Sequence, residues 1–107
     1  MAKYKLFILY DERLYEKLVI HVNKYVSNIE TEYLGEILIN DADIKDIDRG
    51  LGLTPTISRD LFNRIDNNTR EQIEKYTVNM YNTMKSMFLY GSNTFNGIET
   101  LEIEEEE

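Results

Sequence analysis

The feature that most constrains this chain is the segment of residues 50–57, which contains its only proline, Pro55. Proline lacks a backbone N–H, so it is poorly tolerated inside a central strand but suits the first residue of one. The following pyrrolidine ring pushes Thr54 toward extended geometry, and Gly50 and Gly52 allow the chain to turn sharply after a helix. The segment therefore predicts the end of a helix followed by a short strand.

The N-terminal third of the chain predicts a strand and then a helix. Residues 3–10 form an apolar run rich in β-forming residues, which is typical of a strand that is buried on both faces. Asp11 can cap a helix, and apolar residues then recur at helical spacing as far as Ser27. These apolar positions are Leu14, Leu18, Val22, Tyr25 and Val26.

The middle of the chain predicts a second strand over residues 33–39, followed by a short helix that Asn40 caps and Gly50 ends. Downstream of the proline, residues 56–58 and 61–65 predict a hairpin. A helix then follows from Thr69 to about residue 88, and Thr69 starts a capping-box pattern. The predicted order is therefore strand, helix, strand, helix, strand, strand, helix.

This order, with Thr54-Pro55-Thr56 opening the third strand, resembles the thioredoxin superfamily over residues 3–90. The resemblance implies a thioredoxin-like β-α-β-α-β-β-α three-layer sandwich in the α/β class. It also implies that Pro55 follows a cis peptide bond and faces the start of the first helix. In relatives, the groove between these two segments receives an extended peptide.

The chain departs from that family at the position of its reactive cysteines. Residues 11–14 occupy the place of the Cys-x-x-Cys motif, and the chain has no cysteine. Disulfide exchange needs an attacking thiolate, so the redox activity is not carried over. The resemblance then implies a peptide-binding groove without chemistry, lined by Asp11, Glu12, Arg13, Thr54 and Pro55.

The C-terminal end predicts a second binding surface. We divide the chain into a domain of residues 1–90 and a flexible acidic tail of residues 91–107. The predicted helix ends in a run that is apolar all round and therefore needs a cover. In the tail, apolar and acidic residues alternate. This pattern is typical of a segment that adds a strand to the edge of a partner's sheet or docks as a short motif in a basic groove. The alternative is a disordered, solubilising acidic end. The candidate partner contacts here are Met87, Phe88, Leu101 and Ile103.

Charge and composition exclude several function classes. The formal net charge is −8, and residues 91–107 contribute six of the glutamates and no lysine or arginine. The rest of the chain is nearly balanced, without the clustered positive charge of a nucleic-acid binder. We expect no membrane span and no secretion signal, because the apolar run near the N-terminus is too short. The expected location is the cytoplasm, or a virion if the chain comes from a phage.

Three groups of polar residues invite a chemical role. His21 is the only histidine, and its predicted place within a helix favours a structural or surface role. Residues 41–48 contain four aspartates, but their spacing fails the EF-hand pattern, so we predict no metal. Tyr10 lies near the position of the hydroxyl that activates glutathione in glutathione transferases; we expect it at the core edge with its hydroxyl in water.

These observations predict a non-catalytic protein-interaction module that uses no cofactor. Its partner would be a protein or a larger assembly, such as a phage particle. Two alternatives stay open. One is an acidic inhibitor that mimics nucleic acid and binds a host protein through charge. The other is a glutathione-transferase-like enzyme. No residue of the sequence is singled out as catalytic.

Overall fold

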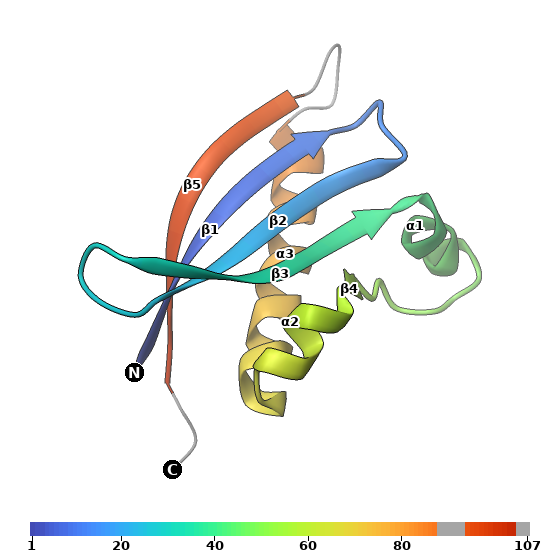
Figure 1. Cartoon of the computed structure of the whole chain (residues 1–107). Coiled ribbons are helices and arrows are strands. Elements are labelled where there is room, and N and C mark those ends of the chain that lie inside the picture. Colours follow the sequence, from blue (N-terminus) through green and yellow to red (C-terminus); the bar gives the residue numbers. More distant parts are fainter. Residues whose placement is uncertain (88–93, 105–107) are drawn as a thin grey trace.

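The computed structural model describes residues 1–87 and 94–104 as a mixed α/β domain, which confirms that part of the predicted fold class (Figure 1). Its strands form one five-stranded sheet, and the helices follow the third strand in the chain. In chain order the elements are β1 (Ala2–Asp11), β2 (Glu16–Tyr25), β3 (Thr31–Asn40), α1 (Asp41–Asp48), β4 (Thr56–Ile57), α2 (Arg59–Arg64), α3 (Asn67–Met87) and β5 (Thr94–Ile103).

The sheet is antiparallel at each of its described strand pairs, in the order β4-β3-β2-β1-β5. Strands β1, β2 and β3 form a meander joined by short turns. The chain then passes through the helices and returns as β5 on the far side of β1. Leu6 lies opposite Val22, and Phe7 lies opposite His21 and Ile98. Because side chains alternate along a strand, these registers fix which residues share a face.

Helices α2 and α3 cover one face of the sheet, and the core lies between them and the strands (Figure 1). Strand β1 contributes its even-numbered residues to this core, because they point toward the helices. The buried core side chains of the described residues are Ala2, Tyr4, Leu6, Ile8, Tyr10, Leu18, Ile20, Val22, Leu34, Ile37, Ile39, Leu61, Ile73, Tyr81, Met84 and Ile103.

The predicted helix after β1 is wrong, because residues 16–25 form strand β2. The apolar residues there fit two periods at once: Leu18 and Val22 are four apart, but Ile20 lies between them. All three side chains are fully buried against the helices. The β-branched run Val19-Ile20, paired with β1, decides for the strand, because branched side chains pack well on a pleated surface.

Two further predicted elements are wrong. The predicted return strand over residues 61–65 is mostly helix α2, with Ser58 as its N-cap. The expected flexible tail contains β5, which pairs with the whole of β1. The order is therefore β-β-β-α-β-α-α-β rather than the predicted one. The described residues contain no cis peptide bond, so the expectation of a cis bond before Pro55 is also wrong.

Two helices agree with the sequence. Asn40 caps α1 with a capping box in which its side chain accepts from the Asp43 backbone N–H, while Asp43 accepts from the Asn40 backbone N–H at 2.9 Å. Helix α3 occupies nearly the predicted range. Met84 is buried and Met80 packs against the core, as the helical spacing predicted. Residues 88–90, predicted to end the helix, lie outside the described residues.

Gly35 allows α2 to approach the sheet. Its φ is +143°, which side chains rarely adopt, and a Cβ atom there would lie 2.6 Å from Ser58 Oγ and 2.8 Å from Leu61 N. The Ser58 hydroxyl in turn accepts from the Glu36 backbone N–H at 3.1 Å and from Leu61 N at 3.4 Å. One serine thereby caps α2 and fastens it to β3.

Candidate functional site

The face of the sheet that the helices leave uncovered carries an apolar patch. We call this surface the open face; in β1 it presents the odd-numbered residues. Phe7 is 40% exposed and Leu9 is 43% exposed in β1, and Ile98 in β5 is 61% exposed. Phe7 lies directly opposite Ile98, and Leu9 lies opposite Val19 of β2. These residues therefore form one contiguous apolar surface across neighbouring strands.

The patch surrounds an open hollow of about 560 Å³. The hollow is formed where β1 lies beside β5, and its surface is mostly apolar. An aromatic or aliphatic side chain of a partner fits such a site, because its burial removes apolar surface from water on both sides. The hollow is lined by Phe7, Ile8, Leu9, His21, Asn96, Gly97 and Ile98.

Lysines stand at one end of the open face. Lys5 Nζ lies 5.3 Å from the ring centroid of Phe7, and Lys3 Nζ lies 5.3 Å from that of Tyr25. Both distances suit cation–π contacts, which keep the ammonium groups over the aromatic rings. Glu102 of β5 pairs with Lys3 in the register. The apolar patch therefore has a charged rim.

His21 lies on the open face in the centre of β2, and not within a helix as predicted. Its Nε2 is 3.7 Å from Glu36 Oε2 of the neighbouring strand, and its ring centroid is 5.8 Å from that of Tyr33. The imidazole is about half exposed. Its role as a surface residue agrees with the structure, and its position adds a polar group to the apolar patch.

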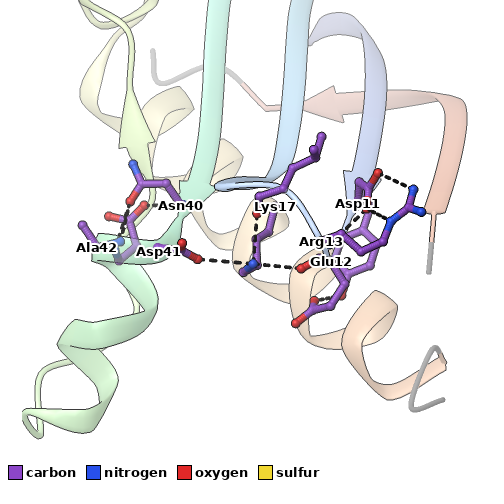
Figure 2. Close-up of polar contacts among 10 residues, drawn as sticks. Asp11, Glu12, Arg13, Lys17, Asn40, Asp41 and Ala42 are labelled. Atoms are coloured by element: carbon purple, nitrogen blue, oxygen red, sulfur yellow. Dashed lines mark hydrogen bonds and ion pairs between the residues drawn. The ribbon is translucent and has the colours of Figure 1, made fainter. Parts of the chain in front are cut away.

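Asp11, Glu12 and Arg13, predicted to line a groove, lie at the β1–β2 turn (Figure 2). The Arg13 guanidinium donates to both Asp11 carboxylate oxygens, each at 3.0 Å. This pairing lowers the pKa of the Asp11 carboxyl below its usual value. Glu12 accepts a hydrogen bond from the Tyr10 hydroxyl. These side chains are thus engaged with each other in stabilising the turn.

Lys17 connects the same turn to α1 (Figure 2). Its ammonium donates to the backbone oxygens of Glu12 at 2.8 Å and Leu14 at 2.9 Å, and it lies 3.2 Å from Asp41 Oδ1. Since the side chain is only 17% exposed, these three oxygens occupy most of its donor capacity. These contacts hold the β1–β2 turn against α1.

The structure does not bring Thr54 and Pro55 to the Asp11–Arg13 turn. They precede β4, which is separated from β1 by both β2 and β3 in the sheet. Pro55 is buried and Thr54 is exposed. The predicted groove is therefore not assembled from these two segments.

The other predicted contacts separate as well. Met87 is 65% exposed at the end of α3, where a partner could reach it, whereas Phe88 lies outside the described residues. Ile103 is fully buried and Leu101 packs against the core. Strand β5 turns both side chains toward the helices, which leaves Ile103 no exposed surface for a partner, while contact of the partly buried Leu101 with a partner stays a prediction.

The structure shows the surroundings of the Tyr10 hydroxyl and of the α1 aspartates, the other two groups considered for a chemical role. The Tyr10 hydroxyl was expected in water, but the residue is fully buried, and burial together with Glu12 raises its pKa. Two aspartates of α1 are engaged. Asp43 completes the capping box of the helix and accepts from the Thr56 hydroxyl, and Asp46 Oδ1 lies 3.7 Å from Arg49 Nη1. No group of three or more potential metal ligands occurs among the described residues.

Sequence reasoning missed the residues of the open face: Phe7, Leu9 and Ile98. Residues 3–10 were interpreted as buried on both faces because the second half of the run is uniformly apolar. The signal against this was the alternation Lys3-Tyr4-Lys5-Leu6, which places two lysines on one face. Ile98 was assigned to the tail, so its place beside Phe7 could not be foreseen.

The chain is not similar to characterised proteins at a level that would assign it to a family: no family model, curated protein or solved structure matches it. In the described residues, no helix is both long and apolar enough to cross a membrane.

Proposed function

We propose that this chain is a non-catalytic protein-interaction module that binds its partner on the open face of the sheet. The observation that carries the proposal is the exposure of Phe7, Leu9 and Ile98 side by side on adjacent strands. An antiparallel sheet with one solvated face normally carries polar residues there. A contiguous apolar patch with a polar rim marks a surface that binds another molecule.

The composition of the patch supports a protein partner. Interface cores are enriched in aromatic residues and depleted of charge, while their rims are polar. Here Phe7 stands in the centre, and Lys3, Lys5 and Glu36 stand around it. The open hollow beside Phe7 offers a place for one anchoring side chain of the partner.

The mixed charge of the open face argues against mimicry of nucleic acid. A mimic needs a continuous acidic surface, whereas Lys3 and Lys5 are part of this one. The proposal also does not depend on the thioredoxin resemblance, because the open face lies outside the groove that this resemblance implied. Membership of a larger assembly, such as a phage particle, remains an extension of the same proposal.

The experiment is a pull-down from the native source with the full chain as bait. The test variant combines Phe7→Thr and Ile98→Thr, which keep strand-forming residues while removing the apolar patch. The matched control is Ile29→Thr, since Ile29 is 90% exposed in the β2–β3 turn and off the open face. We expect proteins captured by the wild type and the control to be lost with the test variant. Equal capture by all three chains would contradict the proposal.

A further inference from the structure

Strand β5 forms one outer edge of the sheet (Figure 1). Within the described residues, it pairs with β1 along its whole length and with no other strand. In an antiparallel pair, every second residue turns its backbone N–H and C=O toward the neighbouring strand, so the alternate residues of β5 turn theirs outward. Such a row of unpaired backbone groups is a template for one more strand.

The opposite edge of the sheet is protected from pairing, whereas the β5 edge is not. Strand β4 contains only two residues, and the buried Pro55 comes directly before it. Strand β5 contains ten residues without a proline, and its register with β1 continues over its whole length without a shift. Short strands, prolines and bulges are means by which proteins keep edges from pairing. Because β5 has none of them, its edge is able to accept a strand.

Glutamates determine the charge of this edge. Glu99, Glu102 and Glu104 are exposed, and none of them forms an ion pair with another described residue. Residues 94–104 contain no lysine or arginine. Lys3 lies opposite Glu102, but its ammonium lies over the Tyr25 ring of β2, which is on the other side of β1 from β5. The edge is therefore acidic, and it favours a basic strand over a second copy of itself.

The glutamates stand on both faces of β5. Odd-numbered residues face the helices, since Ile103 is fully buried and Leu101 packs against the core, and Glu99 belongs to this side. Glu102 lies on the open face together with Ile98, which is 61% exposed. The side chains of an added strand alternate in the same way. Two cations that lie opposite Glu99 and Glu102 must therefore stand three residues apart, one on each face.

We propose that the outer edge of β5 binds an extended basic segment of a protein partner, which adds a sixth strand to the five-stranded sheet. The added strand is antiparallel to β5, because this pairing is the more stable per residue. From its N-terminus it reads basic-x-x-basic-apolar, with the basic residues opposite Glu102 and Glu99 and the apolar residue opposite Ile98. Main-chain hydrogen bonds supply affinity, and these side chains select the sequence. The inference rests on the proposed function, since Ile98 belongs to both surfaces.

The test is an NMR titration of the full chain with the capped peptide Thr-Lys-Thr-Thr-Lys-Val-Thr-Val. We expect the peptide to slow amide hydrogen exchange at alternate residues of β5, because their outward N–H groups become bonded. Glu99→Gln/Glu102→Gln should weaken binding about three- to tenfold, as the loss of two exposed ion pairs implies. Unchanged exchange throughout β5 would overturn the inference.

The matched control is Glu30→Gln/Glu32→Gln, which changes the net charge equally. Both residues are exposed, in the β2–β3 turn and in β3, and β2 and β1 lie between β3 and β5. We expect this variant to bind the peptide like the wild type. Equal weakening by the two double variants would show that the peptide responds to net charge alone and would overturn the assigned edge.

N-methylated peptides separate strand addition from attraction between charges. One peptide is methylated at its odd-numbered positions and the other at its even-numbered positions, and both keep the two lysines. Only alternate N–H groups of an added strand point toward β5. We therefore expect one of the two peptides to lose binding and the other to bind like the parent. Equal binding of both would overturn strand addition.

These outcomes can be separated from those of the pull-down. If the peptide does not bind, but captured proteins are still lost with Phe7→Thr/Ile98→Thr, the basic strand is overturned and the proposed function is supported. If the peptide pairs with β5, but all chains of the pull-down capture equally, the edge site is supported and the open face is contradicted as the binding surface.

Discussion

Replacement of Gly35 by alanine tests the account of how α2 is held on the sheet. The added Cβ would lie 2.6 Å from Ser58 Oγ, 2.8 Å from Leu61 Cβ and 2.8 Å from Leu61 N. Real Cβ atoms do not approach other atoms so closely, so the helix or the strand must move. Two of the three atoms belong to Leu61, a fully buried core residue at the start of α2. A shift there also loosens the core.

The cost can be built from its parts. Overpacking costs about 1–3 kcal/mol, and a non-glycine residue at positive φ costs about 1–3 kcal/mol. Displacement of Ser58 weakens its hydrogen bond with the Glu36 N–H, worth about 0.5–1.5 kcal/mol. Because one movement relieves several of these terms, we expect Gly35→Ala to lower the free energy of unfolding by about 2–5 kcal/mol. Urea denaturation followed by circular dichroism measures this value.

Two other glycines provide matched controls. Gly50 has φ +80° but nothing within 4 Å of a Cβ atom, so Gly50→Ala should cost only the backbone term, about 1–2 kcal/mol. Gly52 has neither constraint, and Gly52→Ala should change stability by less than about 1 kcal/mol in either direction. If Gly35→Ala is no less stable than Gly50→Ala, the close approach of α2 does not depend on this glycine.

Three further predictions follow from burial. Ile103→Ala should destabilise the chain by about 2–5 kcal/mol, and Ile98→Ala by less than about 1 kcal/mol, because only Ile103 is buried; urea denaturation compares them. Tyr76→Phe should leave thermal stability unchanged or raised, since the buried Tyr76 hydroxyl has no hydrogen-bond partner among the described residues; a clear fall in Tm would contradict this. Burial raises the pKa of Tyr81 to about 12. Tyr81 of the unfolded chain ionises first, near pH 10. The stability that the neutral Tyr81 hydroxyl contributes is therefore complete below about pH 10 and is lost as the pH rises to about 12. This loss is roughly 2–3 kcal/mol of the free energy of unfolding, so urea denaturation should show a smaller fall over this pH range in Tyr81→Phe.

Sequence analysis predicted correctly those helices and strands whose signals lie within or next to their own residues. Asn40 and Asp43 form the capping box of α1 directly from adjacent residues. The apolar spacing of α3 needed no tertiary information, because Ile73, Thr77 and Met84 lie on one face of a long helix. The first and second predicted strands, over residues 3–10 and 33–39, lie within β1 and β3.

The elements that failed were decided by pairing across long distances in the sequence. Residues 16–25 fit a helix or a strand by spacing, and the partner strand β1 makes them a strand. Residues 94–103 are acidic and turn-like on their own, and become β5 only because β1, near the start of the chain, offers an edge along which Ala2 lies opposite Ile103. The open face also depends on pairing between strands that are distant in the sequence. Phe7 and Ile98 are neighbours through that pairing alone, so the sequence showed each residue but not the patch.

The central claim is that the open face is the surface on which this chain binds protein. Hydroxyl-radical footprinting tests it most directly, with the free chain compared with the chain bound to a captured partner. We predict that oxidation of Phe7, Leu9 and Ile98 falls on binding, while Phe62, which is 48% exposed on α2, keeps its rate. Protection of Phe62 or Met87 with no change at Phe7 would show that the chain binds through another surface.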